Sequence, residues 1–150
     1  MNSSKPHRAT IYCEQAEILS HLAFDGAQYI LRVQAPKCAS HALPGSFAHI
    51  QCHPLRPMRR PLSIMRVSPS QGWVDFLYKA VGEGTELLSQ AQVGESLSLL
   101  GPIGQGFTLN DDRPLRLLIG GGVGIPPMVF LAEQIKQQKQ QLHSFVIMGS

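Results

Sequence analysis

Short apolar runs separated by glycine and proline fill the first two thirds of the chain, and they constrain its fold more than any other feature. Each run has the length and composition of a β-strand. The runs lie at residues 8–21, 28–35, 47–53, 61–67, 73–79 and 96–100. This spacing predicts a mainly β fold, either a barrel or a sandwich. Residues 85–90 follow Gly82 and Gly84, and they predict one short helix capped by Thr85.

The pattern changes after Asp112. Successive segments then predict a short buried strand, a tight glycine turn, a helix and a second strand, at residues 115–119, 120–124, 126–141 and 145–148. Such a βαβ unit belongs to a parallel sheet whose two faces are covered by further helices. Because one unit is far smaller than a self-sufficient doubly wound domain, we expect the sequence to break off inside its second domain. The alternative is a complete small protein whose βαβ segment packs on the barrel or on a second copy.

Composition narrows the function classes. The 150 residues are 43% apolar, which is enough for a buried core, and 15% charged against about 25% in typical proteins. A surface so poor in charge favours a cofactor or partner. The net charge of +3 is spread thinly, and its densest group, Arg56, Arg59, Arg60 and Arg66, is too sparse for a nucleic-acid tract. Nucleic-acid binding is therefore not expected.

Cysteine spacing and hydropathy bear on location. Cys13, Cys38 and Cys52 lie far apart and form neither a CxxC pair nor a disulfide framework, which favours the reducing cytoplasm. No stretch approaches the roughly 18 continuous apolar residues of a membrane span, so none is expected. His49 and Cys52 would face opposite sides of a strand, and we predict no metal site there. With no nucleophile elbow and no usefully spaced carboxylate pair, no hydrolytic catalytic residue is predicted.

Two segments of the predicted barrel could bind a phosphorylated ligand. At residues 59–64 an arginine, a proline and a serine open an apolar strand, and a guanidinium beside rigid backbone suits phosphate. At residues 77–79 a strand ends before Gly82 and Gly84, and the helix amides that follow suit an anion. Together the segments could hold both ends of a pyrophosphate. Taken alone, the first segment is better explained by a surface arginine beside a strand, and the second is equally consistent with an ordinary glycine turn and helix cap.

Two glycine-rich segments follow. Residues 101–107 contain three glycines and a proline, which favours a loop that lines a ligand and joins two domains over a purely structural linker. Residues 120–127 lie where a parallel strand meets a helix, the position at which nucleotides bind in open α/β sheets. They depart from the usual dinucleotide fingerprint, because Pro127 stands where a third glycine is expected. We predict a turn close to a phosphate.

Five motifs, in their order and spacing, resemble those of the ferredoxin-NADP reductase superfamily. They are Arg60, Pro61, Leu62 and Ser63; Leu77, Tyr78 and Lys79; Gly84 and Thr85; residues 101–107; and residues 120–127. Within the superfamily the chain resembles the electron-transfer subunit of dihydroorotate dehydrogenase. Leu62 departs from the aromatic residue that many plant-type reductases carry there, and an aliphatic residue suits this branch.

The resemblance implies a six-stranded antiparallel FAD-binding barrel with one short helix at residues 7–112, after a disordered lead at residues 1–6. The first βαβ unit of a Rossmann-like NAD-binding domain, truncated, would follow at residues 113–150. By this likeness Arg60 pairs with the FAD phosphates, Ser63 lies near the isoalloxazine, and Leu77, Tyr78 and Lys79 flank the cofactor. Pro61 and Leu62 would be further cofactor-binding residues. Gly84 and Thr85 would bind pyrophosphate, and Gly121, Gly122 and Gly124 would form the nucleotide turn.

The same resemblance implies an electron-transfer role in pyrimidine biosynthesis. NADH or NADPH would reduce FAD, and a [2Fe–2S] cluster, whose cysteines are expected beyond Ser150, would pass electrons to the FMN of a catalytic dihydroorotate dehydrogenase subunit. A homodimer is a further expectation, because an uncovered βαβ unit leaves apolar surface. Two alternatives remain. One is another NAD(P)H-dependent reductase subunit, linked to hydrogenase or sulfide chemistry, and the other is a non-catalytic binding barrel.

Overall fold

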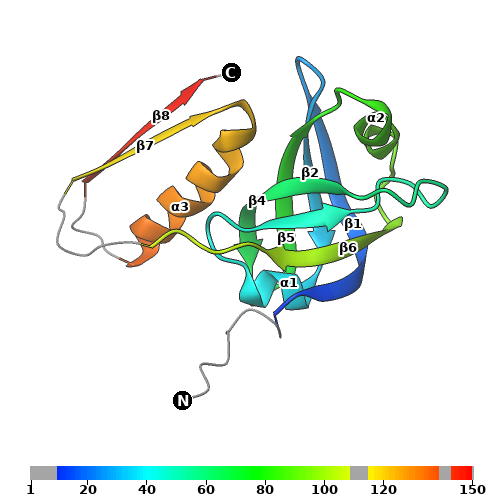
Figure 1. The fold of residues 1–150 in the computed structure, drawn as a ribbon, viewed down its shortest axis with the longest axis horizontal. Coiled ribbons are helices and arrows are strands. Elements are labelled where there is room, and N and C mark those ends of the chain that lie inside the picture. The colour runs from blue at the N-terminus through cyan, green and yellow to red at the C-terminus, as the bar shows by residue number, and fades with distance from the viewer. Residues whose placement is uncertain (1–9, 109–114, 139–142, 150) are drawn as a thin grey trace.

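The computed structural model describes residues 10–108, 115–138 and 143–149 (Figure 1). Antiparallel strands form a closed barrel in the order β1-β2-β5-β4-β3-β6. They are β1 (Tyr12–Phe24), β2 (Gln28–Gln34), β3 (Phe47–Ile50), β4 (Arg60–Ser68), β5 (Trp73–Lys79) and β6 (Ser96–Ile103). The prediction of a mainly β fold with a six-stranded antiparallel barrel is thereby confirmed.

Alternation along the strands fills the barrel. Ile18 of β1, Leu31 and Val33 of β2, and Val74 and Phe76 of β5 are fully buried. Their neighbours in sequence are partly or fully exposed, except for the buried Asp75. This two-residue period is what closes one face of a sheet around a core. Leu88 of the helix that follows β5 joins the same core.

The barrel carries two short helices where the sequence predicted one. α1 (Pro36–His41) begins with Pro36 in its first turn, and the backbone N–H groups of Lys37 and Cys38 donate to the carboxylate of Glu14 on β1, at 3.0 and 2.8 Å. Pro suits the first turn because that N–H would be unpaired in any case. The cap comes from a residue far away in sequence, so the local sequence carried no sign of it.

The predicted short helix exists as α2 (Glu83–Ser89), but it begins before Thr85. Gly82 is the residue that precedes its first turn. The Thr85 hydroxyl oxygen accepts the backbone N–H groups of Val81 and Gly82, at 3.1 and 3.3 Å. Thr85 therefore supports the entry to α2 from inside the first turn, in the manner of the second half of a capping box.

The βαβ unit predicted after Asp112 is also present. β7 (Leu115–Gly121) runs through a 3₁₀ turn (Gly122–Gly124) into α3 (Ile125–Gln138), and β8 (His143–Gly149) pairs with β7 in parallel. The end of the predicted helix, residues 139–141, lies outside the described residues. A small core of Leu118, Leu131 and Ile135 joins α3 to the sheet.

α3 lies between the β7–β8 sheet and β4 of the barrel (Figure 1). The opposite face of that sheet exposes Leu117, Ile119, Phe145 and Ile147, each more than half accessible to solvent. Within the described ranges, no helix is both long and apolar enough to span a membrane.

Candidate cofactor cleft

A cleft of about 360 Å³ opens where the barrel meets the second sheet. One wall belongs to the barrel and is formed by the starts of β2 and β4, the end of β5 and the entry to α2. The other wall belongs to the turn between β7 and α3. The lining residues are Gln28, Pro61, Leu62, Ser63, Leu77, Tyr78, Lys79, Val81, Thr85, Gly122, Val123, Ile125 and Pro126.

The barrel wall gathers residues that the sequence placed in three separate motifs. Pro61, Ser63 and Leu77 come from β4 and β5, which are neighbouring strands. Pro61 lies opposite His49 of β3 in the register, and its missing N–H therefore has to be tolerated within a paired strand. Thr85 reaches the same cleft from α2. Three separate sequence segments thus form one continuous surface.

Arg60 and Gly84 adjoin the cleft and contact each other. A Cβ added to Gly84 would lie 2.9 Å from Nε of Arg60, so the absence of a side chain lets the guanidinium lie against α2. Arg60 is exposed and has no ion pair with an acidic residue among those described. Lys79 is exposed as well and lines the cleft. This end of the cleft therefore carries positive charge that is free to meet an anion.

Tyr78 is held in place from inside the barrel. The carbonyl of Ala91 can only accept, so Nδ1 of His21 donates to it at 3.0 Å. Nε2 of the same neutral imidazole then accepts from the Tyr78 hydroxyl at 2.8 Å. The Tyr29 ring stacks on Tyr78 with centroids 5.3 Å apart. Burial, together with the neighbouring Tyr29 and Cys52, raises the pKa of Tyr78 above its ordinary value. Tyr78 is accordingly a neutral, fixed part of the barrel wall.

Sequence reasoning did not find His21. A β-bulge between Ile18 and Ser20 shifts the pairing of β1 with β2, and His21 comes next. Such a bulge changes which residues of a strand face inward. A lone histidine in a strand gives no signal of this in the sequence.

The second wall is a tight glycine turn. A Cβ on Gly120 would lie 2.8 Å from the carbonyl oxygen of Gly124, so the turn closes on itself. Gly122 has a φ of +51° and lines the cleft, whereas Gly121 and Gly124 flank it without forming the lining. Val123 projects from the turn with 91% of its surface exposed. Val123, Ile125 and Pro126 were not predicted as site residues.

The glycines of residues 101–107 serve close packing. A Cβ on Gly101 would meet that of Ala48 at 2.8 Å, and one on Gly106 would meet that of Leu43 at 2.8 Å. The segment lines a second cleft, with His41 and Ser46, and takes no part in the lining of the first. The interpretation as a ligand-lining loop thus does not apply to the cleft that gathers the other motifs.

The described residues contain no group of three histidine, cysteine or acidic side chains placed to hold a metal ion. Burial raises the pKa of the Cys38 thiol to about 12, with Glu14 adding to the effect. Burial also raises the pKa of Cys52, and the charge of Arg60 opposes that rise. Both buried thiols are therefore protonated near neutral pH, which makes them poor nucleophiles and poor metal ligands.

No family model matches the chain, but curated proteins and solved structures do. The electron transfer subunit of dihydroorotate dehydrogenase B (NAD(+)) from Desulforamulus reducens is 39% identical over 118 residues, which are 76% of this chain and 44% of the relative. The same subunit from Geobacillus thermodenitrificans is 37% identical over 129 residues, 81% of this chain and 49% of the relative. The chain thus spans about half the length of the curated relatives it matches.

Solved structures share the fold. The ferredoxin reductase of carbazole 1,9a-dioxygenase superposes with a TM-score of 0.79 at 25% identity, over 93% of this chain and 44% of the other. The NADH-dependent reduced ferredoxin-NADP oxidoreductase gives a TM-score of 0.77 at 25% identity, over 90% and 47%. Because each match includes at least 90% of this chain, it covers both the barrel and the βαβ unit.

Proposed function

We propose that this chain, which belongs to the ferredoxin-NADP reductase superfamily, is the FAD-binding part of an electron transfer subunit. Its relatives are the electron transfer subunits of dihydroorotate dehydrogenase B. Residues 7–112 would be the FAD-binding barrel, and residues 113–150 the start of the NAD(P)-binding domain. The observation that carries the proposal is the cleft itself. It brings together residues from each FAD motif that the sequence analysis identified.

The residues present fit FAD. Pro61 and Leu77 on one wall and Val123 and Pro126 on the other leave an apolar slot suited to a flat ring system. Beside it, the charge of Arg60 lies against Gly84, where a larger side chain would push it away. An apolar slot next to unpaired positive charge matches a molecule that joins an aromatic ring to a diphosphate.

Each site residue receives a role in this proposal. Arg60 binds the diphosphate through charge-assisted hydrogen bonds, with Pro61 keeping the backbone rigid beside it. Ser63 offers a hydroxyl to a ring heteroatom, and Leu62, Leu77, Tyr78 and Lys79 form the wall against which the ring lies. Gly84 and Thr85 complete the diphosphate end. These assignments rest on the cleft lining and on the Arg60–Gly84 contact.

The second wall would face the nicotinamide nucleotide. Gly121, Gly122 and Gly124 form the turn at the carboxyl end of β7, the place where open α/β sheets bind nucleotides. When bound, FAD accepts a hydride from NADH or NADPH and releases electrons one at a time. The chain's own residues bind and orient the cofactor and exclude water from it, and we assign none of them an acid or base role.

The partners follow from the relatives. We propose that the electrons pass to the FMN of a catalytic dihydroorotate dehydrogenase subunit in pyrimidine biosynthesis, through a [2Fe–2S] cluster whose ligands lie outside this chain. The spacing of the three cysteines favours a cytoplasmic location. Pairing of two copies through the exposed face of β7 and β8 would bury its apolar side chains.

A titration of the purified chain with FAD tests the cofactor assignment. We expect quenching of flavin fluorescence and a shifted visible spectrum. Arg60→Met should weaken binding about 10- to 100-fold, because a hydrogen bond to a charged group contributes about 1.5–3 kcal/mol. Lys37→Met removes the same charge from α1, away from the cleft, and should leave the affinity unchanged. Absence of any spectral change with the unmodified chain would overturn the assignment.

The partner assignment needs a separate experiment. A catalytic dihydroorotate dehydrogenase subunit that contains FMN should co-purify with the full-length protein. It should be reduced by NADH only when the FAD-loaded protein is present. Equal reduction by the FAD-loaded protein of an unrelated ferredoxin, with none of the FMN subunit, would instead favour another reductase of the same superfamily.

A further inference from the structure

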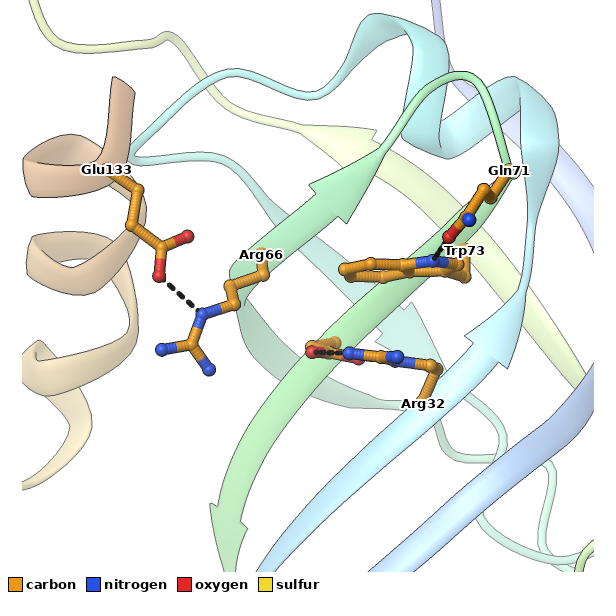
Figure 2. Close-up of polar contacts among 6 residues, drawn as sticks. Arg32, Arg66, Gln71, Trp73 and Glu133 are labelled. Carbon is orange, nitrogen blue, oxygen red and sulfur yellow. Dashed lines mark hydrogen bonds and ion pairs between the residues drawn. The ribbon is translucent and has the colours of Figure 1, made fainter. Parts of the chain in front are cut away.

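Four charged side chains from four elements gather where the barrel meets α3 (Figure 2). They are Arg32 of β2, Arg66 of β4, Asp75 of β5 and Glu133 of α3. Two separate ion pairs result, Arg32 with Asp75 and Arg66 with Glu133. Neither pair was predicted from the sequence.

The first pair is closed on itself. Arg32 donates from Nε and from Nη2 to the two carboxylate oxygens of Asp75, at 2.7 and 2.8 Å. Asp75 is almost wholly buried, and the Arg32 guanidinium lies 3.7 Å from the centre of the Trp73 ring (Figure 2). The Trp73 Nε1 is in turn held by Gln71 at 2.6 Å. Arg32 is thus clamped by a planar bidentate pair and a ring.

The second ion pair joins Arg66 to Glu133, although another carboxylate, that of Asp75, lies opposite Arg66. Arg66 lies directly opposite Asp75 in the register of β4 and β5, so the carboxylate across the strand is its nearest partner along the sheet. Both oxygens of that carboxylate already accept from Arg32. Arg66 instead extends to α3 and donates from Nε to Glu133 at 2.6 Å. Arg32 thus already neutralises the charge of the carboxylate that lies opposite Arg66.

The contact at Glu133 links the two walls of the cleft. β4 carries Arg66 and, at its other end, Pro61 and Ser63 of the barrel wall. α3 carries Glu133 and begins at Ile125, which with Pro126 belongs to the second wall. Eight residues of helix, about 12 Å, separate Ile125 from Glu133. The ion pair at Glu133 restrains α3 at a point well away from the cleft. A small tilt of the helix about this point moves Ile125 and Pro126, and with them the second wall.

We propose that Arg66 and Glu133 are positioning residues that set the width of the FAD cleft, and that Arg32 directs Arg66 to Glu133 by occupying Asp75. This inference rests on the proposed function, because it concerns the same cleft. The side chains of Arg66 and Glu133 are 38% and 42% exposed, so solvent screens the pair and its effect is modest. We expect changes of about threefold to fivefold in FAD affinity.

The test is FAD titration of four variants. Arg66→Met and Glu133→Gln should each weaken FAD binding about threefold to fivefold, and the double variant should be no worse than either single one. Glu17→Gln removes an exposed carboxylate from β1, remote from the pair, and should bind FAD like the unmodified chain. Additive losses, or unchanged affinity in both single variants, would overturn the proposal.

Arg32 has its own test. In Arg32→Met the freed Asp75 should take Arg66 from Glu133, and the FAD affinity should fall as it does in Glu133→Gln. Adding Glu133→Gln to Arg32→Met should then change nothing further, because Glu133 has already lost its partner. A further loss of threefold or more would show that Arg66 still meets Glu133 and would refute the role of Arg32.

Hydrogen exchange without FAD gives a second readout. The amides of residues 125–138 should exchange faster in Arg66→Met and Glu133→Gln than in the unmodified chain, while those of β2 and β5 keep their rates. If the unmodified chain binds no FAD, the proposed function fails, and this exchange still tests whether the Arg66–Glu133 pair holds α3 in place. If the chain binds FAD and neither affinity nor exchange responds to the variants, the positioning role of the pair is refuted and the proposed function stands.

Discussion

Substitution of Gly84 should separate cofactor binding from stability. A Cβ at this position would lie 2.9 Å from Nε of Arg60, 3.4 Å from its Cγ and 3.7 Å from its Cδ. The flexible arginine can yield, and its Nε must withdraw by about 0.5 Å to restore ordinary contact. The backbone of Gly84 is not in the left-handed region, so alanine meets no strain there. Gly84→Ala should therefore displace Arg60 without harming the fold.

Gly84→Ala should affect the free energy of unfolding and the FAD affinity in opposite directions. Alanine favours a helix over glycine by up to about 1 kcal/mol, so the free energy of unfolding should stay constant or rise slightly. Loss of the whole Arg60 interaction would cost about 1.5–3 kcal/mol of binding free energy. A displacement forfeits part of that, and we expect FAD to bind about threefold to tenfold more weakly. Gly84→Val, with a larger side chain, should approach the loss in Arg60→Met.

Gly82→Ala is the matched control. No atom lies within 4 Å of a Cβ added at Gly82, and its φ of −164° is open to any residue. As the residue before the first turn of α2, it should lose a little stability and no FAD affinity. Fluorescence titration with FAD and urea unfolding of both variants measure the two effects. Equal FAD affinity in Gly84→Ala and Gly82→Ala would refute the reasoning, provided that Arg60→Met binds FAD weakly.

Three further predictions concern the barrel itself. Asp75→Ala should lower the free energy of unfolding in urea by about 2–3 kcal/mol, because it leaves the clamped guanidinium of Arg32 without its carboxylate; an unchanged midpoint would contradict this. A thiol reagent should modify Cys13 alone in the folded chain and also Cys38 and Cys52 after unfolding; rapid native reaction of a second thiol would show that the burial is wrong. The thiol of Cys38 has a pKa of about 12 in the folded chain and 9.0 in the unfolded chain. Above pH 9 the unfolded thiol loses its proton while the folded one keeps it, which favours unfolding. The contribution of Cys38 to the free energy of unfolding is therefore complete below pH 9 and falls by up to about 1.4 kcal/mol per pH unit above it. Cys38→Ala should show a correspondingly shallower alkaline decline in unfolding measurements.

The local pattern of the sequence was enough to predict the barrel strands and the βαβ unit. Strand periodicity and turn residues are properties of consecutive positions, so β2, β5 and the βαβ unit after Asp112 appear almost as predicted. The motifs expected to bind FAD were identified in the same way, and eight of the twelve residues that they contributed to the predicted site line one cleft. Arg60 and Gly84 adjoin it, and Gly121 and Gly124 flank its lining.

Contacts between residues that are distant in the sequence could not be predicted from local sequence patterns. α1 depends on Glu14 across the barrel, and His21 faces inward only because β1 bulges. Val123 lies in the predicted glycine-rich turn, but only the fold places its side chain in the second wall of the cleft. Arg66 has two carboxylates within its surroundings, and it pairs with Glu133 of α3 while Arg32, from another strand, pairs with Asp75. Such features arise only when the barrel closes and α3 docks, because only then do these groups compete for the same partners.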